Sequence, residues 1–436
     1  MDTFAQPKPV RLTLPGYRHL LLFFIPLALS SSMMTLEPLI INTTLSHGSN
    51  SEVALAAYSV MFSISLLIEA PVIMLVSAST ALSRTRDSFR LLFRFMLILG
   101  IGSTTIGFLV ALTPLYDWLV LDLMHIPPAV AEVARPALVI MAIWSLPVAW
   151  RRTLQGVLIA HDRTPIVTLA TIVRLLALFA ALSIGRQLAP DRMLMVSAAA
   201  MQVSVISEAL IVTGPAFRIA KSMPAGPDVQ PLTWRSLIHF YQPLAITMIL
   251  RQITQPLLNA GIAAAQLPQL SLAAWSVSWS LVVLPFGVTM GLEQVAIAKG
   301  TTPAALGKVR RFSWGVGLFL STLLVLIAFT PLVHPVLGTL FDLTAEIEPL
   351  VIEAIRWLAL LPLLQSLQAL LRGIAIDQDR TSDVRAAVAI GLVATLLVTV
   401  LGPKVSMCTG IIIGTVTTMT VALAEVGWLA WRERRA

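Results

Sequence analysis

The chain has 436 residues, of which 57% are apolar and only 12% are charged. A soluble domain carries about 25% charged residues because its surface needs them, so this composition excludes an ordinary soluble protein and predicts a largely lipid-facing surface. The net charge of +8 could suit a nucleic-acid partner, but the basic residues gather into no single patch that fits a groove, which argues against one. The single cysteine, Cys408, excludes an intrachain disulfide.

Apolar runs of about 20 or more residues recur along the chain, each followed by a polar break. A segment in lipid must satisfy its own backbone groups, so each run is predicted to be a helix. The fold class expected is all-α, a polytopic membrane protein with twelve transmembrane helices. The first span follows a polar segment without a small-residue cleavage site and is therefore expected to be retained. In chain order the spans are 18–42, 53–80, 90–113, 133–160, 164–186, 193–217, 235–262, 270–298, 311–333, 349–375, 383–402 and 405–431.

Basic residues gather at one end of these spans. They occur at the N-terminus (Lys8, Arg11, Arg18), after span two (Arg84, Arg86, Arg90, Arg94), around the turn after span four (Arg151, Arg152, Arg163), between the halves (Arg218, Lys221, Arg235), after span eight (Lys299, Lys308, Arg310, Arg311), around the turn after span ten (Arg372, Arg380, Arg385) and at the C-terminus (Arg432, Arg434, Arg435). The opposite connections hold Glu52, Asp117, Asp122, Glu132, Asp342, Glu346 and Glu348. The positive-inside rule makes the basic end cytoplasmic. We therefore expect a multi-pass protein of the cell (inner) membrane with both termini in the cytoplasm.

A shift of 217 residues brings the two halves of the chain into register. Residues 55–60 then fall on 272–277, residues 113–115 on 330–332, and Glu208 on Glu425. We expect a six-helix lobe at 1–217, a cytoplasmic linker at 218–234, and a second six-helix lobe at 235–436. Six spans per half make the repeats parallel, an arrangement in which two lobes rock about a site near the midplane. Spans one, two, seven and eight are expected to line the cleft between the lobes.

Polar residues beside prolines mark the candidate substrate site, because interrupted helices in corresponding positions point to a binding site in transporters. Arg251, Gln252, Gln255 and Asn259 form a stripe around Pro256, and Glu37 and Asn42 flank Pro38 in the first half. A charge at this depth is costly and faces a cavity or a partner. Arg251 could hold a carboxylate or phosphate in a forked hydrogen bond. The alternative is a salt bridge between the lobes, with Glu37 or Glu69.

Other ionisable residues have weaker assignments. Glu69 and Glu293 lie in spans two and eight and could take up a coupling proton or cation. Arg174 and Glu208 come at similar depth in adjacent helices, which favours a buried pair over substrate contact. The histidines lack metal-ligand spacing, so no metal site is expected, and no P-loop motif is present for ATP. No cofactor is expected.

The stretch from His239 to Asn259, with its Pro-Leu-Ala start, Arg251-Gln252 pair, Gln255-Pro256 step and Asn259, resembles span seven of the progressive ankylosis (ANK) family. Gln255 stands where that family has an arginine. Residues 284–287 followed by Glu293 are similar to the family's Pro-aromatic-Gly and later acidic residue. The turns at 156–164 and 373–381 resemble those of the wider MOP superfamily, which contains the MATE drug antiporters and the lipid-linked sugar flippases. The resemblance implies a rocker-switch exporter of organic anions, with pyrophosphate, ATP and citrate among them.

Two functions remain open at the level of sequence. The first is secondary active, alternating-access export of a small organic or phosphate-containing anion that is citrate- or pyrophosphate-like. The second is MATE-like antiport of drugs or organic cations driven by protons or sodium, through Glu37, Glu69 or Glu293. A membrane-embedded enzyme is disfavoured because no acid–base pair or metal cluster is apparent. The expected partners are a small-molecule substrate, a proton or sodium ion and the lipid bilayer, and the protein is expected to be a monomer without nucleic acid.

Overall fold

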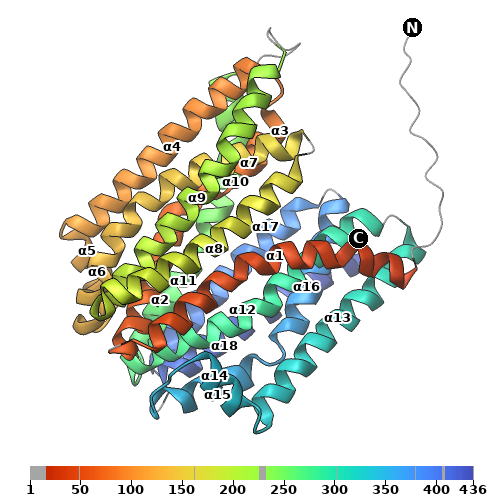
Figure 1. The fold of residues 1–436 in the computed structure, drawn as a ribbon. Coiled ribbons are helices and arrows are strands. Elements are labelled where there is room, and N and C mark those ends of the chain that lie inside the picture. The colour runs from red at the N-terminus through yellow and green to blue at the C-terminus, as the bar shows by residue number, and fades with distance from the viewer. Residues whose placement is uncertain are drawn as a thin grey trace, which may run out of the picture.

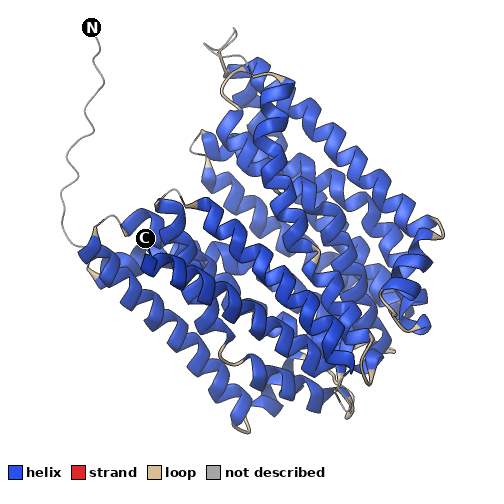
Figure 2. Ribbon diagram, turned by 180° about the vertical axis from the view of Figure 1, so that it is seen from behind, coloured by secondary structure: helices blue, strands red, loops and turns tan. Residues whose placement is uncertain are grey.

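The computed structural model describes residues 16–48, 50–161, 163–224, 232–300, 302–378, 380–404 and 408–435. Nearly all of them are helical, and no β-strand occurs in these ranges (Figure 2). The basic N-terminal residues before 16 and positions 225–231 of the expected linker lie outside the described residues. The all-α prediction is confirmed.

The helices follow the predicted spans closely, and several spans are broken into two helices. The first half contains α1 (Tyr17–Ser46), α2 (Ser51–Ile73) with α3 (Leu75–Leu82), α4 (Arg86–Leu112), α6 (Pro128–Met141) with α7 (Ser145–Ala160), α8 (Thr164–Leu188) and α9 (Met193–Ser222). The second contains α10 (Trp234–Gln252) with α11 (Thr254–Ala263), α12 (Pro268–Lys299), α13 (Pro303–Phe329), α15 (Ile347–Leu358) with α16 (Leu361–Asp377), α17 (Thr381–Leu401) and α18 (Gly410–Arg435). Short helices α5 (Leu115–Asp117) and α14 (Val333–Leu340) lie in the connections. Since α9 ends at Ser222, the first residues of the expected linker are helical.

Within the described residues, nine helices are long and apolar enough to cross a membrane, and the pair α15–α16, bent by 42°, makes a tenth. Two further positions complete the predicted twelve. These are α1, and the broken pair α10–α11. Each stands first in its half of the chain.

The internal repeat is visible in the helix boundaries. Helices α4 and α13 begin and end at positions 217 residues apart. Their N-caps are also equivalent, because Thr85 accepts a hydrogen bond from the amide of Ser88 and Thr302 accepts one from the amide of Ala305. Such a cap satisfies one of the amides that a helix start leaves unpaired. The two halves therefore repeat each other in local structure as well as in sequence.

The first helix of each half packs against the other half (Figure 1). Helix α1 runs along α12, where a side chain in place of Gly287 would come within 2.6 Å of the Thr35 hydroxyl, so the two helices approach closely. In return, α10 packs against α2. The Tyr241 hydroxyl of α10 donates a hydrogen bond to the carbonyl of Pro71, near the break between α2 and α3. A backbone oxygen at a broken helix is thus satisfied by a neighbouring helix, as lipid requires.

We predict the orientation from the charged connections, and it can be tested with single cysteines in a Cys408→Ser background. Cysteines at Glu132 and Asp191, at the acidic end, should react with a membrane-impermeant maleimide added outside intact cells. Cysteines at Arg84 and Gln378, at the basic end, should react only after the cells are broken. All four positions are exposed. The reverse labelling pattern would contradict the predicted cytoplasmic termini.

Candidate functional site

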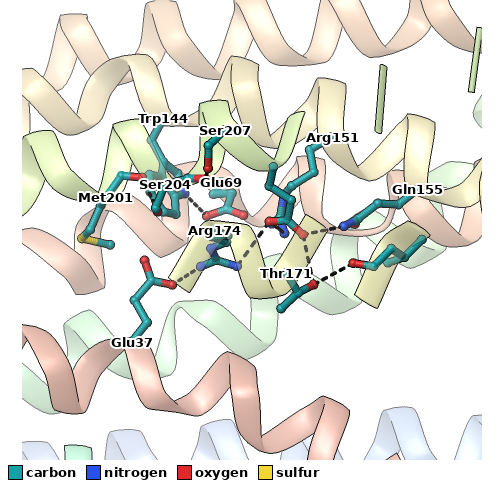
Figure 3. Close-up of polar contacts among 12 residues, drawn as sticks. Glu37, Glu69, Trp144, Arg151, Gln155, Thr171, Arg174, Met201, Ser204 and Ser207 are labelled. Atoms are coloured by element: carbon teal, nitrogen blue, oxygen red, sulfur yellow. Dashed lines mark hydrogen bonds and ion pairs between the residues drawn. The ribbon is translucent and has the colours of Figure 1, made fainter. Parts of the chain in front are cut away.

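A buried ion network surrounds Glu208 of α9 in the first half. Figure 3 labels its neighbours Arg151, Gln155, Thr171 and Arg174. Arg151 of α7 donates to this carboxylate at 2.7 Å and Gln155, one turn later, donates at 2.8 Å. From α8, the Thr171 hydroxyl donates at 3.3 Å, and the Arg174 guanidinium lies 3.7 Å away. Glu208 is fully buried. A buried carboxylate requires a cation and hydrogen-bond donors around it, and here two helices, α7 and α8, supply them.

Arg174 also reaches the first helix. Its guanidinium donates to the carboxylate of Glu37, and both side chains are buried. The predicted contact between Arg174 and Glu208 is therefore present, and Glu37 is a second partner of the same arginine. One oxygen of Glu37, Oε1, is buried without a hydrogen-bond partner among the described residues. This leaves one acceptor position on Glu37 for a proton or another donor.

Glu69 of α2 adds a third carboxylate to the same region. It accepts a hydrogen bond from the indole of Trp144, which stands at the break between α6 and α7. Its negative charge interacts with the guanidinium groups of Arg151 and Arg152. Three carboxylates and three guanidinium groups thus share the interior of the first half. The assignment of Arg151 and Arg152 to a basic turn was wrong, because both lie within α7 and Arg151 is only 3% exposed.

The second half has an equivalent centre built from different residues. Glu425 of α18 stands where the repeat places Glu208, and it accepts hydrogen bonds from Gln368 and from Arg372, the latter at 2.5 Å. The repeat equates Gln368 with Arg151 and Arg372 with Gln155, so arginine and glutamine have exchanged places on the helix. Arg372 likewise belongs to α16 and not to the turn to which the sequence assigned it. Gly391 replaces Arg174, and a side chain there would come within 2.6 Å of Glu425 Oε1.

Arg251 borders a small polar cavity beside this centre. The cavity measures about 120 Å³ and is lined by Arg251 of α10, by Phe286, Thr289, Met290, Glu293 and Gln294 of α12, and by Gln365, Gln368, Ala369 and Arg372 of α16. Arg251 is an exposed residue, and its side chain forms part of the cavity lining. Glu293 and Glu425 attract its charge and Arg372 repels it. No carboxylate of the described residues lies within 4.0 Å of Arg251, so its donors are free for a ligand.

Two asparagines form a symmetric contact between the halves, which we name the asparagine–serine clasp (Asn42 with Ser276, and Asn259 with Ser59). Asn42 donates to the backbone carbonyl of Ser276 at 3.1 Å and accepts from its hydroxyl at 2.8 Å. Asn259 donates to the carbonyl of Ser59 at 3.0 Å and accepts from its hydroxyl at 3.1 Å. The 217-residue shift converts one pair into the other. All four clasp residues lie towards the acidic end of the spans.

Aromatic pairs continue this symmetry beside the clasp. Tyr58 stacks on Phe62, with ring centroids 5.4 Å apart, and Trp275 stacks on Trp279 at 5.7 Å. These rings line a cavity of about 60 Å³, together with Pro38, Gln255 and three of the clasp residues, Asn42, Ser59 and Ser276. Helices α1, α2, α11 and α12 supply its walls, and they are the four spans expected at the interface between the lobes.

The structure distributes the predicted site residues over three places. Glu37 and Glu69 lie in the ion network of the first half, Arg251 and Glu293 at the cavity of the second half, and Asn42, Gln255 and Asn259 at the clasp and its cavity. Gln252 ends α10 at the helix break. The salt bridge considered between Arg251 and Glu37 is not formed, because Glu37 pairs with Arg174. The roles of all eight residues in binding or coupling remain predictions.

Apart from Arg174, sequence reasoning missed the partners of Glu208 and Glu425. Arg151, Gln155, Gln368 and Arg372 occupy equivalent positions of the repeat and have matching chemistry. That coincidence was a usable signal, because two halves that each bury a glutamate must each supply a donor set. Within the part of the chain that the structure describes, no group of three His, Cys, Asp or Glu side chains is placed to hold a metal ion.

The helices described above are arranged as in solved transporters of the MOP superfamily. An inward-facing multidrug resistance transporter of the MATE family matches with a TM-score of 0.70 and 15% identity, over 94% of this chain and 97% of that one. An outward-facing MATE transporter matches at 0.62 and 15% identity, over 97% of each chain. A MOP superfamily transporter from Pyrococcus furiosus, described as having a binding pocket of reverse polarity, matches at 0.58 and 16% identity over 96% of each chain.

The chain belongs to the progressive ankylosis protein (ANKH) family, which matches residues 10–228 and 227–423. The two matched segments meet within the expected linker, so each covers one half of the internal repeat. No curated protein matches the chain. The resemblance noted around Arg251 is thereby confirmed at the level of the family.

The clasp predicts a conformational consequence. Asn42→Ala combined with Asn259→Ala removes the side-chain hydrogen bonds of both asparagines across the interface, and each buried polar group left unpaired costs about 1–3 kcal/mol. We expect the acidic ends of the halves to separate in part of the population. Spin labels at Glu132 and Glu346, in a Cys408→Ser background, should then report a longer-distance population. Ser204→Ala, which removes a buried hydrogen bond within α9, should leave the distances unchanged. Unchanged distances in the double variant would contradict a gating role.

Proposed function

We propose that the chain is a secondary active, alternating-access exporter of a small organic or phosphate-containing anion, citrate- or pyrophosphate-like. The observation that carries the proposal is Arg251, a guanidinium at a polar cavity with no carboxylate partner within 4.0 Å among the described residues. A guanidinium presents donors in a fixed fork that matches a carboxylate or a phosphate. Arg372, on the opposite wall, adds a second positive charge, although its nearest partner is Glu425.

The size of the cavity supports an anionic group as its occupant. A water molecule occupies about 30 Å³ in the liquid, so 120 Å³ accommodates one carboxylate or phosphate group. Sites for drug-sized ligands measure about 300–1,000 Å³. The glutamines at positions 294, 365 and 368 can donate hydrogen bonds to such a group. The remainder of a larger anion would extend towards the space that opens when the lobes move.

The coupling sites are proposed at Glu69 and Glu293. Glu293 shares the cavity with Arg251, so its charge competes with an anionic substrate for the same guanidinium. Protonation of Glu293 would remove that competition and would couple proton binding to anion binding. Glu69 belongs to the ion network of the first half, where it accepts from Trp144. We further propose that the protein works as a monomer in the cell (inner) membrane with cytoplasmic termini, as the positive-inside rule indicates.

The alternative is MATE-like antiport of an organic cation driven by protons or sodium. One observation favours it, namely the buried Glu37 Oε1 that has no hydrogen-bond partner among the described residues. An acceptor of this kind can bind a proton or a small cation. The structural relatives do not decide between the two, because one of them is described as a MATE drug transporter and another as having a binding pocket of reverse polarity. The fold therefore accommodates pockets of either sign.

Transport in proteoliposomes separates the two functions. Purified protein should move labelled citrate or pyrophosphate, and Arg251→Gln should raise the concentration needed for half-maximal transport about tenfold or more. A charge-assisted hydrogen bond is worth about 1.5–3 kcal/mol, which corresponds to that factor. Arg311→Gln is the matched control, because Arg311 is an exposed arginine at the basic end. It should not change transport.

The contrary result would be transport of a cationic dye in place of either anion. In that case Arg251→Gln would be tolerated while Glu37→Gln or Glu69→Gln abolished exchange. Such an outcome would replace the anion exporter by the cation antiporter.

A further inference from the structure

A groove on the outer surface of the first half combines positive charge with an aromatic floor. It lies between α4 and α9 at the basic end of the spans and measures about 550 Å³. Its lining is Arg86, Phe89, Arg90, Phe93, Arg94, Phe217, Ala220 and Lys221. We name it the basic groove. It is separate from the buried ion network and from the cavity at Arg251, and the proposed transport cycle does not use it.

Four basic side chains surround the basic groove, and Asp87 is the one carboxylate of the described residues that forms an ion pair with any of them. Arg86, Arg90 and Arg94 follow one another at intervals of four residues, so they lie on one face of α4. Arg86 donates to the backbone carbonyls of Lys221 and Met223 and ties α4 to the end of α9. Arg90 forms an ion pair with Asp87 at 3.3 Å, but both side chains are largely exposed, so water screens the pair. Arg94 has no carboxylate within 4.0 Å among the described residues.

The floor of the groove is a cluster of aromatic rings. Phe89, Phe93 and Phe217 contact one another with centroid separations of 5.7–5.9 Å, and Trp150 lies 5.1 Å from Phe93. Ring faces and edges of this kind pack against glycerol and acyl carbons. The occupant that fits such a groove therefore carries a negative charge and an apolar body.

The position of the groove indicates where that apolar body comes from. One turn beyond Arg94, Ile98 is 60% exposed, and Ile101, Leu109 and Leu112 continue the same exposed stripe along α4. An exposed apolar stripe on a membrane-spanning helix faces lipid acyl chains. The basic groove thus opens onto the hydrocarbon boundary, at the depth of phospholipid headgroups. A soluble metabolite would have to approach along the lipid-facing side.

We propose that the basic groove binds the headgroup of an anionic phospholipid. The phosphate would lie against Arg90 and Arg94, whose guanidinium groups can donate paired hydrogen bonds to it, and the upper acyl chain would rest on the phenylalanine cluster. Basic pockets between transmembrane helices are suited to anionic headgroups on electrostatic grounds. Lys221, on the α9 side, adds a further charge for a headgroup that extends beyond its phosphate.

The internal repeat provides a built-in comparison. The 217-residue shift converts Phe89, Phe93 and Phe217 into Leu306, Arg310 and Arg434, which line a groove of about 690 Å³ on the second half. There Arg310 pairs with Glu433, which also lines the groove. The equivalent groove thus has an acidic residue within it and lacks the cluster of three phenylalanines. We expect it to bind anionic lipid much more weakly.

Native mass spectrometry of delipidated protein in detergent tests the proposal, with phosphatidylglycerol, phosphatidylcholine and soluble glycerol 1-phosphate as probes. The wild-type protein should retain phosphatidylglycerol at least tenfold more tightly than phosphatidylcholine. Arg90→Gln with Arg94→Gln should weaken phosphatidylglycerol binding about tenfold. Arg310→Gln with Arg434→Gln, the matched pair on the second half, should leave it unchanged.

A second double variant separates loss of lipid binding from misfolding of the protein. Arg90→Lys with Arg94→Lys preserves both charges and should retain binding to within about threefold. Equal binding of the two lipids, or no loss in the Arg90 and Arg94 glutamine variant, would overturn the proposal. Competition by glycerol 1-phosphate at the same concentration as phosphatidylglycerol would also overturn it, since it would identify a site for free phosphate esters in place of a lipid.

Discussion

The cost of holding charge in a medium without water governs this structure. A carboxylate within a lipid-embedded bundle requires a cation and donors at hydrogen-bond distance, and each half of the chain buries one such glutamate at the same position of the repeat. In the first half Glu208 is enclosed by Arg151, Gln155 and Arg174. In the second half Gln368 and Arg372 satisfy Glu425. The helices around each glutamate are therefore held in place by the same requirement.

What differs between the halves is how their buried glutamates and arginines are paired. Arg174 links Glu208 to Glu37, so the arginines of the first half are matched by its glutamates. Glycine takes the place of Arg174 in the second half, and Glu425 closes onto α16 without a partner from α17. Arg251 lies on α10 and forms no ion pair with Glu425, because Arg372 already neutralises that carboxylate. Both halves therefore contain matched arginines and glutamates, but in the second half Arg251 and Glu293 line a shared cavity and are not within 4.0 Å of each other.

The spans and the internal repeat could be predicted from the sequence. The contacts of several charged residues could not, for physical reasons. Apolar runs located every span, because lipid enforces helical structure on them, and the repeat identified the equivalence of Glu208 and Glu425. Arg151 and Arg372 were misplaced because an arginine near the end of an apolar run has the same composition whether it faces water or a buried carboxylate. The stripe from Arg251 to Asn259 was expected to form one site. The helix breaks at Ile253, however, and its two parts face different cavities. The ion pair between Glu37 and Arg174 depends on the packing of α1 against α8, which are distant in sequence. No local sequence pattern predicts such a contact.

The contact between the two halves follows the internal repeat, whereas several of the charged residues do not. The asparagine–serine clasp and its aromatic pairs obey the repeat closely, with both members of each pair present. A contact that must open when two similar lobes move apart is simplest to release when it is the same on both sides of the axis, since both hydrogen-bonded pairs then separate in one motion. A binding site has no such constraint, because a single small substrate needs only one set of ligands. The charged residues depart from the repeat at Arg174, whose equivalent is Gly391, and at Arg251. If Arg251 binds the substrate as proposed, a few substitutions in one half set the polarity of the site, while the clasp is common to both halves.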